Sequence, residues 1–174
     1  MKRHSSSRLH SGAAGFLIVL SLVGCSLNQM PLPPHGYRPI ANDVLYSRIE
    51  HLRGVARVDG MVWTNGFDNP NGYGGEIYAE RSADPAAVLD EVLAVLRQGA
   101  PSADYLGVRV IPPDGGVAIR TSDIIGLSCP TDLLARYGPQ PGTGKPLPNA
   151  PKLRLRRPGD PIGCPPPSAH SSPR

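Results

Sequence analysis

The segment from Asp84 to Pro101 constrains the fold most, because a helix start, an apolar face and a helix stop all coincide in it. Asp84 can cap a helix by accepting a backbone N–H bond, and Pro85 suits the first turn, where its missing N–H costs nothing. Gly99 and Pro101 then end the helix. Its apolar positions form a wide face: Val88, Leu89, Val92, Leu93, Val95 and Leu96. A helix with so wide an apolar face must be packed against another layer of structure.

A second amphipathic helix is predicted over roughly residues 43–53, upstream of the first. Its apolar residues recur at helical spacing: Leu45, Ile49 and Leu52. Asn42 or Asp43 can act as its N-cap, and Gly54 sits where a left-handed residue would close it.

Four stretches alternate between apolar and polar residues with the period of two that is typical of strands. They are residues 58–64, 76–80, 106–111 and 117–121. Asn-Gly turn signals fill residues 65–75, so the first two strands should form an antiparallel hairpin with a long exposed tip. The turn at 112–116 joins the last two strands.

The predicted order is therefore α-β-β-α-β-β, which defines an α+β fold. Two such units build a two-layer sandwich, a four-stranded antiparallel sheet with both helices on one face. This order resembles a circularly permuted ferredoxin-like fold, and the resemblance is one of topology that implies no activity. We assign the domain to residues 42–137.

The C-terminal part of the chain reads differently. Residues 131–137 could make a short helix, and residues 138–174 form a Pro/Gly-rich basic tail that buries too little to fold independently, so it is expected to be disordered. Charge separates in the same way: residues 43–137 hold 13 acids and 8 bases, whereas residues 138–174 hold 1 acid and 6 bases.

The N-terminus has the pattern of an export signal. Residues 1–10 are basic and contain no acid, and the apolar run at 12–23 is shorter than the roughly 20 residues that a membrane span requires. The run ends in Leu22-Val23-Gly24-Cys25, which resembles the lipobox of bacterial lipoproteins. That resemblance implies a signal peptide over 1–24, cleavage before Cys25, and a diacylglyceryl group on the Cys25 thiol, often with further acylation such as palmitate at the new amino terminus.

Lipidation would hold the mature chain on the exported outer face of the cell membrane, with residues 25–41 as a Pro-rich tether. The Arg-rich, Ala/Gly/Pro-heavy composition resembles that of actinobacterial envelope lipoproteins. Without residues 1–24, the side chains sum to a charge of +1, so the basic isoelectric point gives no reason to expect nucleic-acid binding.

Cys129 and Cys164 are the two thiols that remain once Cys25 is lipidated. Because an exported protein meets oxidising surroundings, we expect a disulfide between them, with free thiols and metal binding as the alternatives. Two cysteines without a nearby His or a second pair make a poor metal site, so no metal is predicted.

Two segments are candidates for contact with a partner. The hairpin tip gathers rigid aromatic and adaptable amide side chains that suit protein or glycan contacts: Trp63, Phe67, Asp68, Asn69, Asn71 and Tyr73. Equally, these aromatics could fold under the tip as a minor core. The basic run at 152–157 allows three interpretations: a solvated segment, an edge strand against the acidic body, or a contact with anionic lipid headgroups.

No catalytic residues are predicted, since the chain lacks the GxSxG, HExxH and paired CxxC patterns, and no cofactor is implied. The sequence therefore favours a non-enzymatic binding or interaction module. A structural or lipid-carrying envelope module is the alternative, followed by a hydrolase without a recognised motif.

Overall fold

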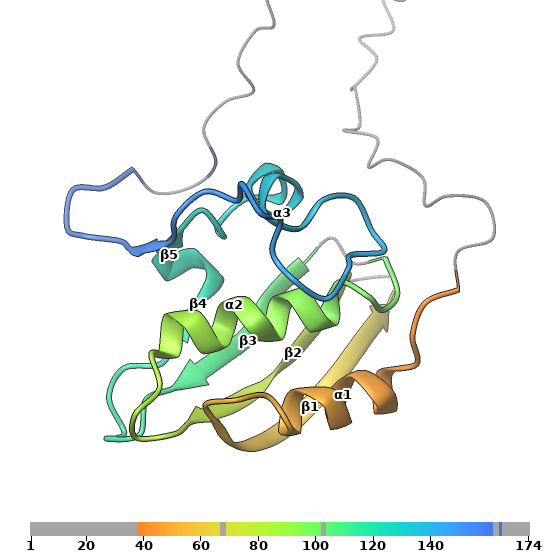
Figure 1. Cartoon of the computed structure of the whole chain (residues 1–174), viewed down its shortest axis with the longest axis horizontal. Coiled ribbons are helices and arrows are strands. Elements are labelled where there is room, and N and C mark those ends of the chain that lie inside the picture. The colour runs from red at the N-terminus through yellow and green to blue at the C-terminus, as the bar shows by residue number, and fades with distance from the viewer. Residues whose placement is uncertain (1–37, 67–68, 102–103, 162–163, 165–174) are drawn as a thin grey trace, which may run out of the picture. The chain divides into compact units, whose positions relative to one another are not determined.

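The computed structural model describes residues 38–66, 69–101, 104–161 and 164, and within them the chain is an α+β domain, which confirms the predicted class. A four-stranded sheet forms one layer, two helices pack on it, and a C-terminal layer lies beside them (Figure 1). The predicted signal peptide, lipobox and most of the tether fall outside the described residues.

The sheet contains β1 (Val55–Gly66), β2 (Asn69–Ala79), β3 (Asp104–Ile111) and β4 (Ile119–Arg120), in that spatial order. The β1–β2 and β3–β4 pairs are antiparallel, but β2 and β3 are parallel, so the prediction of a purely antiparallel sheet is wrong. The helix between β2 and β3 is the reason: it carries the chain back to the end from which β2 started, and neighbouring strands joined in this way run in the same direction. The likeness to a permuted ferredoxin-like fold assumed antiparallel pairing and is not confirmed.

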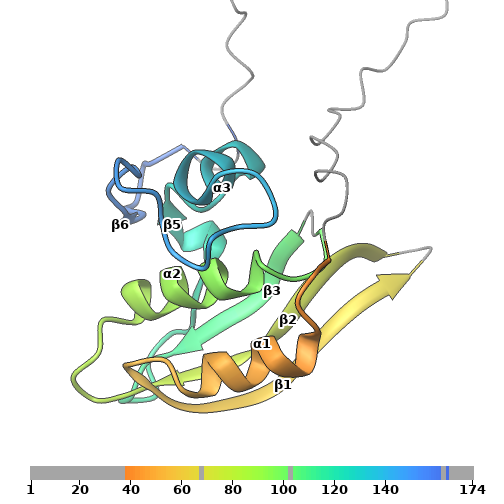
Figure 2. The same cartoon turned by 45° about the vertical axis from the view of Figure 1, so that its right-hand side comes forward.

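Both predicted helices are present and cover the same face of the sheet (Figure 2). In α2 (Pro85–Leu96) the Asp84 carboxylate accepts a bond from the Ala86 N–H at 3.0 Å, the predicted cap. In α1 (Asn42–Glu50) the residue before the helix is Ala41, and no side chain caps it. The Asn42 amide oxygen instead accepts a bond from the Tyr73 hydroxyl at 3.0 Å, so a tertiary contact replaces the local one.

The hydrophobic core lies between this helix layer and the sheet. Its fully buried side chains include Leu45 and Ile49 of α1, Leu89 and Leu93 of α2, and Ile77 of β2. The described core residues run from Leu45 to Tyr137, with Ile40 and Leu153 packed against them. The chain from residue 26 onward therefore contains the whole of this core.

The hairpin is longer than predicted, because most of the expected tip loop at 65–75 is strand β2. Pairing extends to Gly66 opposite Asn69. A bulge between Asp59 and Val62 lets Met61 lie against Gly75, whose φ of +147° and lack of a Cβ both accommodate that contact. The glycines that predicted a loop thus fit an irregular strand instead.

The chain after β4 forms the C-terminal layer: η1 (Thr121–Asp123), β5 (Ile124–Ile125), α3 (Pro130–Tyr137) and β6 (Arg154–Leu155). Strands β5 and β6 pair antiparallel in a small second sheet. The prediction of a disordered tail is wrong for residues 138–161, because backbone bonds hold this segment to the body. These bonds are Gly142 N to Arg97 O at 2.9 Å, Leu147 N to Arg136 O at 2.7 Å, and Arg156 N to Asp123 O at 2.8 Å.

Candidate functional site

Of the predicted tip residues, the structure brings Trp63 and Tyr73 together, with ring centroids 4.7 Å apart. Tyr73 is 2% exposed and also stacks on Tyr105 at 6.0 Å, so its ring belongs to the core. Trp63 is half-buried beside it. These two aromatics follow the alternative interpretation, a minor core beneath the end of the hairpin.

The structure says less about the remaining predicted tip residues. Asn71 is exposed on β2, and Asn69 pairs with Gly66 where the hairpin ends. Phe67 and Asp68 lie outside the described residues. The exposed side chains near this end include Thr64, Asn65 and Asn71.

The sheet face that points away from the helices carries a network of polar side chains. Val58 and Ile77 pair across β1 and β2 and face the core, so their neighbours in sequence face outward. The Arg57 guanidinium lies 3.9 Å from the centre of the Tyr78 ring, and the Tyr78 hydroxyl donates to Glu76 at 2.8 Å. Arg109 of β3 forms an ion pair with Glu76.

This network holds its groups in defined charge states. Hydrogen bonds from Tyr78 and from Arg109 lower the pKa of Glu76, which stays ionised. The same bond to Glu76 raises the pKa of Tyr78, which stays neutral. This outward side of the sheet, the open face, thus presents two arginines, one carboxylate and one tyrosine that hold one another in place.

The predicted disulfide between Cys129 and Cys164 is confirmed, with the two Cα atoms 5.3 Å apart. Cys129 is buried at the start of α3, whereas Cys164 is exposed. The bond therefore fastens the end of the C-terminal segment to the helical part of its layer.

Sequence reasoning missed a buried polar network that joins α2 to α3. The Arg136 guanidinium makes a two-pronged ion pair with the Asp90 carboxylate, and the Tyr137 hydroxyl donates to the same carboxylate at 2.6 Å. Arg136 also donates to the Pro151 carbonyl. Its signal in the sequence was an acid inside the apolar run of α2, but its partners lie 46 and 47 positions away.

A groove of about 280 Å³ opens beside this network, between the first turns of α2 and strand β6. Asp90 and Arg136 line it together with Leu153 and Leu155. Asp90 and Arg136 are paired with each other, and Asp84 and Arg154 also line the groove.

Within residues 38–66, 69–101, 104–161 and 164, no group of three His, Cys, Asp or Glu side chains could hold a metal ion. In the same residues, the helices are too short or too polar to cross a membrane.

Comparison with known proteins found no family model, no curated protein and no solved structure that matches this chain.

Proposed function

We propose that this chain is a lipid-anchored envelope protein whose small domain binds a protein or glycan partner without catalysing a reaction. The observation that carries the anchoring half is the sequence Leu22-Val23-Gly24-Cys25 after a basic and then an apolar segment. The Cys129–Cys164 disulfide supports export, because such bonds persist in oxidising compartments and are rare in the cytosol.

The binding half is supported by two neighbouring surfaces of the sheet. The open face carries Arg57, Tyr78, Glu76 and Arg109 in fixed geometry, and the hairpin end beside it exposes Thr64 and Asn65. Amide, hydroxyl, arginine and tyrosine groups are the side chains that polar recognition surfaces use.

Metabolic labelling with a fatty-acid analogue tests the anchor. The wild-type protein should incorporate label and run as a processed form, and Cys25→Ser should remain a label-free precursor, because serine lacks the thiolate that accepts the diacylglyceryl group. Cys164→Ser serves as the matched control and should be labelled normally. Labelling and normal cleavage of Cys25→Ser would refute the anchor.

Co-purification from native membranes in mild detergent tests partner binding. Deleting residues 65–75 would remove Tyr73 from the core, so point substitutions are the better probe. We expect Tyr78→Ala with Arg109→Ala to lose the partner, while Arg53→Ala with Arg81→Ala, an exposed pair in the turns before β1 and after β2, retains it. Equal recovery with both double variants would remove the open face from the proposal.

A further inference from the structure

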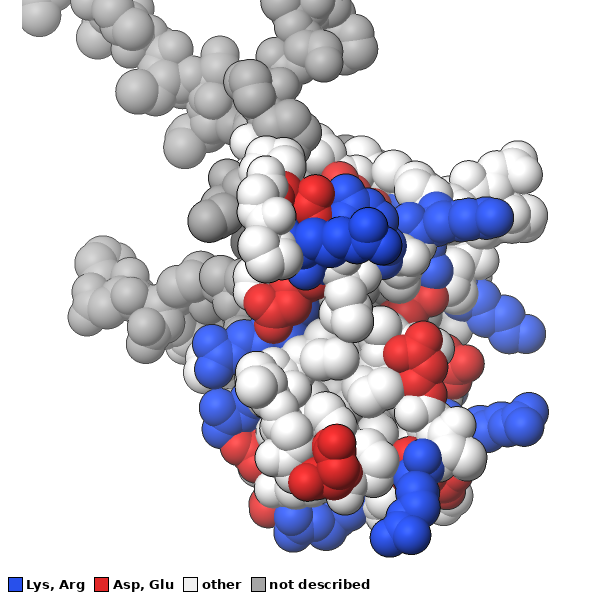
Figure 3. Space-filling model, turned by 90° about the vertical axis from the view of Figure 1, so that its left-hand side faces the viewer, with Lys and Arg blue, Asp and Glu red and all other residues white. Residues whose placement is uncertain are grey.

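The basic run that the sequence left with three interpretations is an ordered surface in the structure. Lys152, Arg154 and Arg157 are exposed, Arg156 is half-buried, and Arg154–Leu155 is strand β6, paired with β5. These four cations define the basic surface. Figure 3 shows Lys and Arg side chains gathered over the upper part of the face on which this segment lies.

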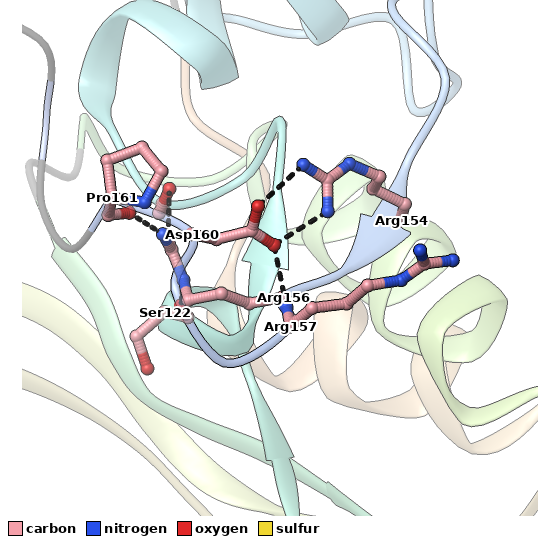
Figure 4. Close-up of polar contacts among 7 residues, drawn as sticks. Ser122, Arg154, Arg156, Arg157, Asp160 and Pro161 are labelled. Atoms are coloured by element: carbon pink, nitrogen blue, oxygen red, sulfur yellow. Dashed lines mark hydrogen bonds and ion pairs between the residues drawn. The ribbon is translucent and has the colours of Figure 1, made fainter.

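Among the described residues, Arg154 is the one cation of this surface that forms an ion pair. Residues 152–161 contain four basic residues and one acid, Asp160. Arg154 holds Asp160 through a two-pronged ion pair at 2.7 and 3.0 Å (Figure 4). That ion pair and the backbone N–H of Arg157 keep the pKa of Asp160 far below its usual range, so the single acid is already fully engaged.

Arg156 fixes the shape of the segment without losing its charge. Its guanidinium donates to the Ser122 carbonyl at 3.0 Å, to the Ser128 hydroxyl at 3.2 Å and to the Pro161 carbonyl, all of which are neutral (Figure 4). The Arg157 guanidinium points away from these contacts. Together with the disulfide at Cys164, these bonds fix the conformation of the segment that carries the basic surface.

We propose that this basic surface docks the domain onto the anionic lipid headgroups of the membrane that holds the Cys25 lipid, an inference that rests on the proposed anchor. The body at 43–137, with 13 acids and 8 bases, is repelled by an anionic bilayer, whereas the segment at 138–161 is attracted to it. Leu155, 50% exposed between Arg154 and Arg157, adds an apolar contact at the headgroup level.

The tether does not select a different face. From Cys25 to Arg38 it can extend roughly 40 Å, at about 3.3 Å per residue, which is longer than the diameter of a domain of this size. An anchored domain can therefore turn any side toward the bilayer, and the charge asymmetry decides which side approaches.

Sedimentation with vesicles tests the proposal on the chain from residue 26, which carries no lipid and retains the whole core. We expect binding to vesicles of phosphatidylcholine with phosphatidylglycerol, weak binding to phosphatidylcholine alone, and a steep loss as salt is raised. Lys152→Gln with Arg157→Gln should reduce the partition coefficient about 25-fold, because each basic residue near the surface contributes about fivefold. Arg53→Gln with Arg81→Gln removes the same charge elsewhere and should have a much smaller effect.

Two outcomes would overturn the proposal. Equal losses in the two double variants would show a response to net charge alone, and displacement by millimolar inorganic phosphate at constant ionic strength would show a site for a soluble anion. Hydrogen exchange adds a positional measurement: vesicles should protect residues 152–157 and leave the hairpin unchanged. The chain from residue 26 lacks Cys25 and carries no lipid, so a negative result in these experiments leaves the proposed anchor intact. Fatty-acid labelling of Cys25 tests the anchor separately.

Discussion

At the scale of single residues, the Asp90–Arg136–Tyr137 network shows what a sequence pattern cannot supply. The apolar positions of α2 were predictable because they obey a local period, and Asp90 sits among them without a local partner. Its charge is satisfied by side chains that arrive from α3. Such a pairing depends on how the layers pack, and neither spacing nor composition encodes it.

Replacing Asp90 should be strongly destabilising. Asp90 and Arg136 are 8% and 9% exposed, so Asp90→Asn leaves a buried guanidinium without its counter-charge. Breaking a buried ion pair from one side costs about 3–5 kcal/mol, and we expect a decrease of that order in the free energy of unfolding by urea denaturation. Asp59→Asn, which breaks an exposed pair with Arg57, is the control and should change little. Comparable losses in both variants would contradict a special role for the buried pair.

Tyr137 should make the protein sensitive to alkali. Burial, followed by the Asp90 charge, raises the pKa of Tyr137 far above its usual value. A raised pKa in the folded state means that the stabilisation is complete below the unfolded value of about 10 and is lost as the pH rises beyond it. We expect the midpoint of urea unfolding to fall between about pH 10 and 12. Tyr137→Phe should weaken that fall; an unchanged slope would assign it to other tyrosines, such as Tyr46.

At the scale of elements, the sequence predicted best where a single local signal decided the outcome. Asp84 and Pro85 begin α2 as expected, because capping and the first turn depend on adjacent residues alone. The direction of β3 could not be obtained in this way, since it depends on which strand the chain meets after α2. The glycines at 72–75 were misleading for a similar reason, because the same residues occur in turns and in bulged strands. Here Gly75 leaves room for Met61 of the neighbouring strand, a contact that the local sequence does not reveal.

The C-terminal segment should respond unevenly to loss of its disulfide. Cys164→Ser removes a cross-link that closes a loop of about 36 residues, worth roughly 4 kcal/mol in the chain-entropy estimate. The bonds of Gly142 to Arg97 and of Leu147 to Arg136 should remain, because they hold the part of the segment that precedes the basic surface in the chain. Hydrogen exchange should therefore accelerate at the Arg156 amide much more than at the Leu147 amide, and trypsin should cut after Lys152 and Arg154. Equal acceleration at both amides would mean that the segment is held as one unit.

At the scale of the whole molecule, the sequence distinguishes a Pro-rich tether from the domain that follows it. The structure places the start of the domain earlier than the sequence predicted. The tether was predicted to extend to residue 41, yet Ile40 packs against the core and its N–H donates to the Gln98 carbonyl at 3.1 Å. Proline content marked this stretch as linker, but one isoleucine and one backbone bond are enough to join its end to the domain.

Truncation should locate this boundary in solution. A chain that starts at residue 38 keeps Ile40, and we expect it to melt within about 2 °C of the chain that starts at residue 26, because every described core residue is retained. A chain that starts at residue 42 loses the Ile40 contact and its backbone bond, and should melt about 5 °C lower, which corresponds to roughly 1 kcal/mol in a domain of this size. The substitution Ile40→Ser in the longest chain is the matched control and should reproduce most of that decrease. If removal of residues 26–37 alone lowered the melting temperature as much, the tether would contribute to stability and the domain would begin earlier than Ile40.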